Sequence, residues 1–291
     1  MNAHALILPL LGGFVHCFTA PGFGHFCHFV LAHMALLGAP HCVTETLRLT
    51  QRHQVVHWTP PYAFLHRGRW VCRQVSQGLL DLLRTRLGLA GEVIVALDDT
   101  LVKKWGRKFF GLGLYRDPTD KNPGAHKRRV YGHCWVVLAL LGEYHEGKWV
   151  GFPLAALWFV PLALCSHRWP FLSKIDLAER LLHSLRWPAA RRIVVVDNLY
   201  AKAQLARVGV GHAPCVLVSR LRTNAALYLR PAPPPKPRRG RGPQRSARQL
   251  YHCRSQHQHL TIRIYGKTVT LRAYVGVVIP SRRLGTTRPF G

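Results

Sequence analysis

The sequence predicts a mixed α/β fold: a mixed sheet with flanking helices, preceded by a helical N-terminal region and followed by a β-rich C-terminal segment. Apolar runs of strand length first follow one another and then alternate with helical patterns. Strands joined by short turns pair antiparallel, whereas strands separated by a helix pair in parallel, so one sheet should hold both kinds of pairing.

Residues 1–90 are predicted to form the helical region. The first 44 residues contain no Lys, Arg, Asp or Glu, but prolines, glycines and histidines interrupt them, so no run is apolar enough to span a membrane. We expect buried helices of a cytoplasmic protein with no membrane partner. From Glu45 to Leu89 apolar residues recur every three or four positions, with a break at Pro60-Pro61 and an end near Gly88.

Residues 91–230 are predicted to form the central domain. Four apolar runs have strand length: Val93–Leu97, Val130–Leu141, Trp149–Val160 and Arg192–Val196. Asp98 and Asp99 follow the first run, and Asp197 follows the last. We expect the first and last runs to be adjacent parallel strands, which would bring their acids together.

Helical patterns separate the later strands. Ser173 predicts the cap of a helix from Lys174 to Leu185, with Asp176 in its first turn. Leu199–Val208 is predicted to be a short helix, and Cys215–Val218 a short strand.

The composition changes after residue 230. Residues 231–248 are rich in Pro and Arg and predict an extended basic linker. Residues 249–291 are predicted to carry a β-hairpin, with strands Leu260–Tyr265 and Thr268–Ile279 around a turn at Gly266-Lys267.

The charge balance favours a polyanionic partner. Forty-one Lys and Arg face 12 Asp and Glu, giving a formal charge of +29, and Asp197 is the last acidic residue. Nucleic acid is the leading partner, because each neutralised phosphate releases condensed counterions. The eight cysteines contain no CxxC pair, which disfavours a zinc finger.

Two predicted strands end in carboxylates, Asp99 and Asp197. A carboxylate at the end of a buried strand is costly unless it is paired or binds a metal. Two of them on neighbouring strands predict a shared divalent cation, since Mg²⁺ and Mn²⁺ prefer oxygen ligands. The alternative is that these acids cap the turns that follow the strands.

Four segments carry a family resemblance. They are Leu97–Lys104 (LDDTLVKK), Tyr131–Leu138 (YGHCWVVL), Val194–Asn198 (VVVDN) and Ser219–Tyr228 (SRLRTNAALY). Together they resemble bacterial insertion-sequence transposases with a DDE superfamily endonuclease domain, over about residues 35–280. The Asp-Asp-Thr-Leu block with its two lysines is the most specific of the four.

The resemblance implies an RNase H-like fold and metal-dependent cleavage and transfer of DNA strands. Asp99 would be the first catalytic acid and metal ligand, with Asp98 as an adjacent candidate, and Asp197 the second. The cofactor would be Mg²⁺ or Mn²⁺. DNA, as transposon ends and target, would be the partner of a nucleoid-associated protein, and a homodimer is left open.

The family's third catalytic residue is a Glu on a downstream helix, but no acid follows Asp197. We therefore expect a C-terminally truncated and inactive copy. The alternatives are a non-catalytic DNA-binding remnant and a basic RNA-associated protein.

Basic residues next to these blocks are predicted to contact DNA phosphates. They are Lys103, Lys104, Arg107, Lys108, Arg220, Arg222, Arg238, Arg239 and Arg241. A solvated run of charges without a fixed partner is the alternative for the arginines of the linker. Trp70 and Trp105 are expected to be core residues rather than platforms for stacked bases.

Overall fold

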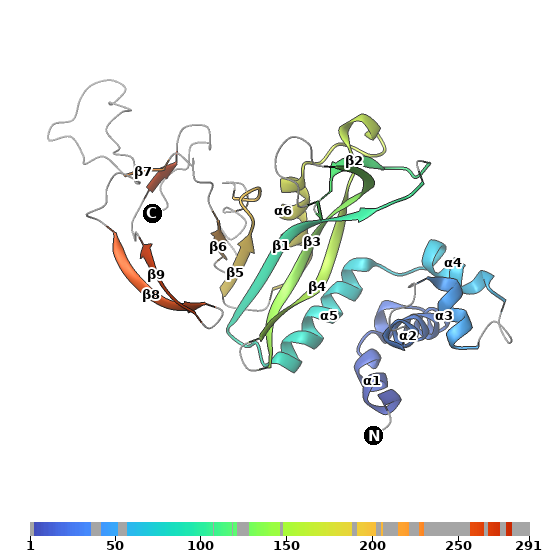
Figure 1. The fold of residues 1–291 in the computed structure, drawn as a ribbon. Helices are drawn as coiled ribbons and strands as arrows, with labels where there is room; N and C mark the ends of the chain where they lie inside the picture. Colours follow the sequence, from blue (N-terminus) through green and yellow to red (C-terminus); the bar gives the residue numbers. More distant parts are fainter. Residues whose placement is uncertain are drawn as a thin grey trace, which may run out of the picture. The chain divides into compact units, whose positions relative to one another are not determined.

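The fold is described from a computed structural model, whose ribbon is drawn in Figure 1. It describes residues 3–35, 42–51, 57–106, 108–117, 119–120, 128–145, 148–187, 191–201, 205, 215–220, 227–229, 257–264, 267–273 and 278–280. The chain divides into two compact units, one formed by residues 1–200 with 204–219 and one formed by residues 201–203 with 220–291.

A six-stranded mixed sheet forms the centre of the first unit. Its strands are β1 (Glu92–Lys103), β2 (Gly113–Arg116), β3 (Arg129–His145), β4 (Lys148–Phe159), β5 (Arg191–Val196) and β6 (Cys215–Ser219). The order is β2-β3-β1-β5-β6, and β4 also pairs with β3. The β1–β3, β2–β3 and β3–β4 pairs are antiparallel, whereas β1–β5 and β5–β6 are parallel. This confirms the mixed sheet, and it is consistent with an RNase H-like domain.

The parallel pairing of β1 with β5 confirms the prediction for the two acid-bearing strands. Leu97 lies opposite Val196, the last residue of β5. β1 is longer than expected, because its other edge stays paired with β3 from Ile94 to Lys103. Asp98 and Asp99 therefore lie within a strand, and the prediction that the strand ends before them was wrong. The short strand β2 was not predicted.

Two helices cover one face of this sheet. They are α5 (Cys72–Leu87), seen alongside the long strands in Figure 1, and α6 (Lys174–Ser184). Leu80 of α5 and Leu181 of α6 are buried against Val95, Leu138 and Val194 of the strands. Burying each such side chain contributes about 1.5–3 kcal/mol to stability. One continuous apolar core therefore holds the sheet to both helices.

Local sequence explains where these helices begin and end. The hydroxyl of Ser173 accepts a hydrogen bond from the Asp176 N–H at 3.2 Å, and the Asp176 carboxylate accepts one from the Ser173 N–H at 2.9 Å. This capping box satisfies N–H groups that the helix leaves unpaired, as the sequence predicted. Gly88 ends α5 in the left-handed conformation, with φ of 64°.

The N-terminal region is helical, as predicted. Its helices are α1 (Ala3–Gly12), η1 (Val15–Cys17), α2 (Ala20–Ala35), α3 (Val43–Leu49) and α4 (Thr59–Arg67), and a further short helix, η4, spans Leu162–Leu164. Pro60 and Pro61 open α4 rather than interrupting a helix, because proline fits the first turn. None of the helices that the structure describes is long and apolar enough to cross a membrane.

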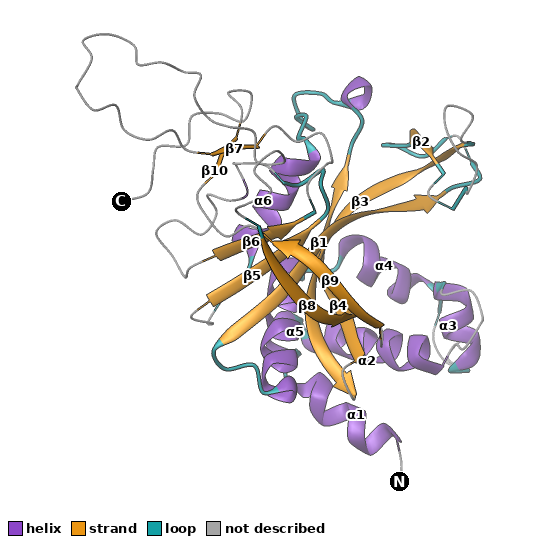
Figure 2. Cartoon of the chain, turned by 60° about the vertical axis from the view of Figure 1, so that its left-hand side comes forward, coloured by secondary structure: helices purple, strands orange, loops and turns teal. Residues whose placement is uncertain are grey.

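The second unit contains two short antiparallel sheets. β8 (Gln258–Ile264) and β9 (Lys267–Ala273) form the predicted hairpin, drawn as a curved pair in Figure 2. The second strand of the hairpin ends earlier than expected. Val278–Pro280 forms a separate strand, β10, which pairs with β7 (Leu227–Leu229). The predicted Pro- and Arg-rich linker, residues 231–248, lies outside the described residues, as does most of Leu199–Val208.

Candidate active site

The two adjacent acids of β1 lie on opposite faces of the sheet. Side chains alternate between faces along a strand, and Val93, Val95 and Leu97 are buried on the face that the helices cover. Asp99 continues this buried face, whereas Asp98 lies on the other face and is exposed.

The carboxylate of Asp99 is held by three side chains. The Lys174 Nζ donates a hydrogen bond to its Oδ2 at 2.6 Å, and the Cys134 thiol donates to the same oxygen at 3.5 Å. The Tyr200 hydroxyl donates to its Oδ1 at 3.4 Å. The side chains of Lys174 and Asp99 are only 23% and 27% exposed, so this ion pair is partly shielded from water.

The same contacts shift the pKa values of the partners. Burial lowers the pKa of Lys174, but the hydrogen bond with Asp99 and the nearby charges outweigh it, so its pKa lies above the ordinary value. Burial raises the pKa of the Tyr200 hydroxyl, and the negative charge of Asp99 raises it further. Lys174 is therefore a stable cation and Tyr200 is a neutral hydrogen-bond donor, and both donate to the Asp99 carboxylate.

Asp98 faces a different neighbour, Asp197. Leu97 pairs with Val196 in the parallel register, so Asp98 comes one residue later on β1 and Asp197 directly follows the end of β5. Burial raises the pKa of the Asp98 carboxyl, and the charges of Asp99 and Asp197 raise it further, while the Asp99 N–H and Lys174 act in the opposite direction. The Asp197 charge is thus one of the neighbours that act on the Asp98 carboxyl, after burial and the charge of Asp99.

A fixed turn presents Asp197. Its carbonyl accepts a hydrogen bond from the Tyr200 N–H at 3.0 Å and one from the Ser219 hydroxyl at 3.3 Å. The first bond closes the turn after β5, and the second ties that turn to the end of β6. The chain direction after the strand is therefore set by the backbone, which leaves the Asp197 carboxylate available for a ligand.

The described residues contain no group of three or more His, Cys, Asp or Glu side chains arranged to hold a metal ion. Within them, Asp98 and Asp197 supply two carboxylates at neighbouring positions. Oxygen donors of this kind suit Mg²⁺ or Mn²⁺, which keep several waters and use few carboxylates.

The basic residues predicted to bind DNA lie in several places. The Nζ of Lys103 donates to the Asp117 carboxylate at 2.8 Å and to the Thr119 hydroxyl at 3.0 Å, so this lysine is engaged within the protein. Lys104 lies 5.9 Å from the centre of the Phe109 ring, and Lys108 is exposed. Arg220, in the second unit, is exposed. Five predicted contacts lie outside the described residues: Arg107, Arg222, Arg238, Arg239 and Arg241.

The Lys103–Asp117 pair is robust to acid. The hydrogen bond from Lys103 lowers the pKa of Asp117 well below its ordinary 3.8, and the hydroxyl and backbone N–H of Thr119 lower it further. A carboxylate with a lowered folded-state pKa stabilises the fold above its ordinary pKa, and this contribution disappears only as the pH falls through the lowered value. The loop next to β1 therefore keeps this ion pair throughout the neutral range.

The two tryptophans expected in the core differ. Trp70 packs on Phe64 at 5.8 Å between ring centres and donates its indole N–H to the Phe64 carbonyl at 3.1 Å, in agreement with the expectation. Trp105 is 95% exposed, so the expectation was wrong for this residue. It lies in the loop that follows β1.

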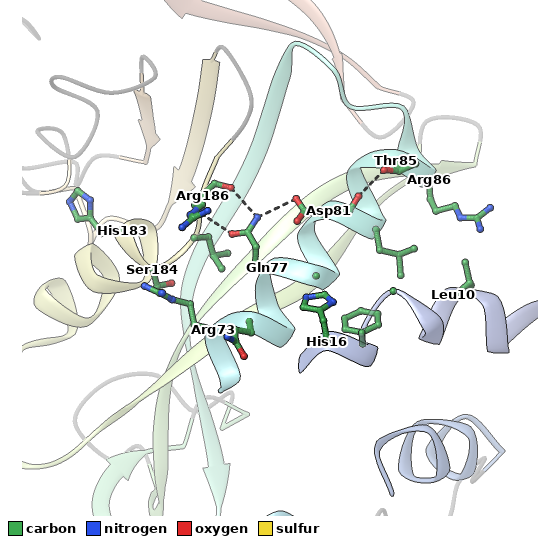
Figure 3. Close-up of a pocket in the computed structure, with 16 residues that line it drawn as sticks. Leu10, His16, Arg73, Gln77, Asp81, Thr85, Arg86, His183, Ser184 and Arg186 are labelled. Atoms are coloured by element: carbon green, nitrogen blue, oxygen red, sulfur yellow. Dashed lines mark hydrogen bonds between the residues drawn. The ribbon is translucent and has the colours of Figure 1, made fainter. Parts of the chain in front are cut away.

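A basic pocket lies away from these carboxylates. Figure 3 shows it between α5, the N-terminal helix and the end of α6, with a volume of about 1020 Å³. Arg73, Arg86 and Arg186 line it, and Gln77 braces its wall by accepting from the Arg186 N–H at 2.8 Å and donating to the Asp81 carboxylate at 3.2 Å. Asp98, Asp99 and Asp197 do not line this pocket, which is therefore separate from the candidate site.

Lys174 and Tyr200 were not singled out from the sequence. The helix that begins at Lys174 was predicted, but the direction of that side chain depends on how α6 packs on the sheet. Tyr200 follows Asp197 by one short turn, and this spacing was the only available signal. Both residues belong to the site because α6 and the turn after β5 pack next to β1, where their side chains reach Asp99.

Comparison with known proteins gives one match. Residues 170–275 match the family model described as DDE superfamily endonuclease. The match begins just before α6 and includes Asp197, but it does not reach Asp98 or Asp99. No curated protein and no solved structure matches the chain. DDE endonuclease domains act on DNA and generally use divalent metal ions. The match, together with the mixed sheet, supports a DDE-type, transposase-like domain in this protein.

Proposed function

We propose that this protein is a DNA transposase of the DDE endonuclease type in which Asp98 and Asp197 hold a divalent cation against DNA. The observation that carries the proposal is the placement of Asp98 on β1 and of Asp197 directly after β5, the parallel strand that pairs with β1. Adjacent strands lie about 4.8 Å apart, which is within the span of two carboxylates that share one cation.

The choice of Asp98 over Asp99 follows from the two faces of β1. The Asp99 carboxylate already pairs with Lys174 at 2.6 Å, and binding a metal there would displace that ammonium group. Asp98 accepts one local hydrogen bond, from the Asp99 N–H at 2.8 Å, and follows Leu97, whose partner Val196 immediately precedes Asp197. We therefore assign Asp99 a positioning role, in which it fixes α6 and the turn after β5 relative to β1.

The donor set fits Mg²⁺ or Mn²⁺ in part. Two carboxylates and several waters suit these hard cations, and a cation would offset the repulsion between Asp98 and Asp197. When bound, it would lower the pKa of an attacking water and stabilise charge on the phosphate. No acidic residue follows Asp197, so residues 198–291 supply no third carboxylate.

The charge of the chain supports DNA as the partner of this site. A formal charge of +29 creates a field that attracts a polyanion, and the exposed Lys108 lies in the loop that continues from β1. A non-catalytic DNA-binding protein is the second candidate, and the lack of acids after Asp197 favours it. It would bind duplex DNA with an affinity that falls steeply as salt rises, but would not cleave it.

Thermal unfolding with and without Mn²⁺ tests the proposed cation site. We expect Mn²⁺ to raise the melting temperature of the wild-type protein, because a ligand that binds only the folded state stabilises it. Asp98→Asn and Asp197→Asn should each raise the melting temperature without metal, because each removes one of the repelling charges. Both variants should lose most of the Mn²⁺-dependent increase.

Asp99→Asn is the matched control for this measurement. It should lower the melting temperature without metal, because Lys174 loses its partner, yet it should retain a Mn²⁺-dependent increase. A metal effect that disappears in Asp99→Asn but persists in Asp98→Asn would assign the cation to Asp99, as first predicted from the sequence. A metal effect that persists in all three variants would contradict a site at these strands.

A further inference from the structure

The loop between β1 and β2 carries large aromatic side chains that are open to solvent. Trp105 is 95% exposed, Phe109 is 53% exposed and Phe110 is 51% exposed. An isolated exposed apolar residue needs no explanation, but three aromatic residues within six positions of one loop form a patch. Such a patch is typical of a surface that a partner covers.

This loop rests on a group of rings that project from the sheet. The Phe110 ring lies 5.7 Å from Trp158 and 5.9 Å from Trp169, and Trp158 stacks on Trp135 at 6.0 Å with an interplanar angle of 22°. We call Phe109, Phe110, Trp135, Trp158 and Trp169, together with Trp105 from the same loop as Phe109, the aromatic shelf. Its members come from the β1–β2 loop, β3, β4 and the segment before α6.

The position of the loop on the shelf is fixed by two contacts. His133 shares a hydrogen bond of 3.0 Å with the Phe110 carbonyl, and its ring lies 4.8 Å from that of Trp158. Gly111 has φ of 74°, and a Cβ there would overlap the indole ring of Trp158. The exposed aromatic residues are therefore presented by a loop whose backbone packs closely on the sheet.

The shelf lies on the same face of the sheet as Asp98. Directly opposite residues of an antiparallel pair share a face, and Asp98 lies opposite Val137, while Thr100 lies opposite Trp135. Trp135 in turn lies opposite Trp158. Trp135 lies on the strand next to Asp98 and two residues from Val137, the residue opposite Asp98. Standard strand spacings therefore put the Trp135 backbone about 8 Å from that of Asp98. A nucleotide next to a phosphate at Asp98 would thus reach Trp135, and a strand several nucleotides long could continue past the end of β1 to Trp105.

The charge around the shelf is positive. The sequence has no acid from residue 100 to residue 116, or from residue 160 to residue 172. Lys104 lies over the Phe109 ring, Lys108 is exposed, and the exposed Arg168 precedes Trp169. The closest acid along the loop, Asp117, is 5% exposed and is neutralised by Lys103. Cations interleaved with exposed rings fit a ligand with both phosphates and flat bases.

We propose that the aromatic shelf binds unpaired DNA bases next to the carboxylates, with Trp105 as the outermost stacking surface. The inference rests on the proposed function, because it places those bases beside a site of phosphodiester chemistry. Stacking accepts any base, so the shelf distinguishes unpaired from paired DNA rather than one sequence from another. A splayed or single-stranded end would therefore bind more tightly than a blunt duplex.

The test compares two DNA probes with the full 291-residue protein. One is a blunt duplex, and the other is the same duplex with a short single-stranded tail that carries 2-aminopurine, whose fluorescence is quenched by stacking. We expect the wild-type protein to bind the tailed probe more tightly and to quench its fluorescence. Trp105→Ala should reduce this preference on the order of tenfold and restore fluorescence, with blunt-duplex affinity unchanged.

Trp149→Ala is the matched control, since Trp149 is 57% exposed at the other end of β4. It should leave the preference unchanged, and melting curves should show that both variants fold. Blunt-duplex binding without preference for the tail, or equal effects of the two variants, would overturn the inference and leave the DNA-binding function intact. Failure to bind either probe would instead count against the proposed function itself, whose cation site is measured independently by Mn²⁺-dependent stability.

Discussion

The 291 residues should not cleave transposon-end DNA above background in Mg²⁺ or Mn²⁺. Two carboxylates leave at least one cation loosely held, and a misplacement of about 1 Å in such a site costs on the order of a hundredfold in rate. Gel assays of end cleavage with a labelled duplex would measure this. Cleavage that Asp197→Ala leaves unchanged would show that the acids of β1 and β5 do not carry the chemistry.

If the proposed function is right, a version that carries an added helix with a Glu as a third carboxylate should cleave transposon-end DNA. In that version we expect Asp98→Ala and Asp197→Ala each to lower the rate by about a hundredfold or more, because each removes a ligand that positions the cation. Asp99→Ala is the informative comparison. A smaller loss for Asp99→Ala, accompanied by lower stability, would fit a positioning residue, whereas an equal loss at unchanged stability would make Asp99 a metal ligand.

Replacing Tyr200 with alanine should destabilise the protein by about 3–5 kcal/mol, because it removes a large ring from a packed core. Tyr200 is 0% exposed and belongs to the cluster formed by the sheet, α5 and α6. Urea unfolding followed by circular dichroism would measure the change. The hydrogen bond that closes the turn after Asp197 comes from the backbone N–H of residue 200, which alanine retains, so the folded variant should keep the Mn²⁺-dependent stabilisation.

Two further variants serve as controls for Tyr200→Ala: one removes only the Tyr200 hydroxyl, and the other removes an exposed apolar side chain. Tyr200→Phe keeps the ring and removes a hydrogen bond of 3.4 Å to Asp99, so it should cost about 1 kcal/mol or less. Leu114→Ala removes an apolar side chain that is 49% exposed on β2, and it should cost little. If Tyr200→Ala cost no more than Leu114→Ala, the packing described around Tyr200 would be wrong.

Periodicity and capping were sufficient to predict the main elements. The run before Asp98, the run before Asp197 and the pattern between them predicted two neighbouring parallel strands, and the sheet contains them. Ser173 and Asp176 predicted the start of α6 because their hydrogen bonds are local. Local chemistry of this kind is readable without knowing the rest of the fold.

The side chains of the candidate site depend on contacts that are distant in sequence. Choosing between Asp98 and Asp99 requires knowing which face of β1 is covered by α6. Lys174 forms its ion pair with Asp99 only because α6 packs on that face. Because the alternation of side chains has a period of two, moving one residue along the strand exchanges the faces. The exposure of Trp105 likewise depends on how its loop lies on Trp158, which no local pattern encodes.

The pairing of β1 with β5 also orders the folding of the protein. The hairpins β1–β3 and β3–β4 join nearby parts of the chain, whereas Asp98 and Asp197 are about a hundred residues apart, and closing long loops is slow. During synthesis the antiparallel half can assemble before residue 197 has left the ribosome. Asp98 and Asp197 then come together only when β5 docks, so a chain caught midway lacks the two carboxylates of the proposed cation site.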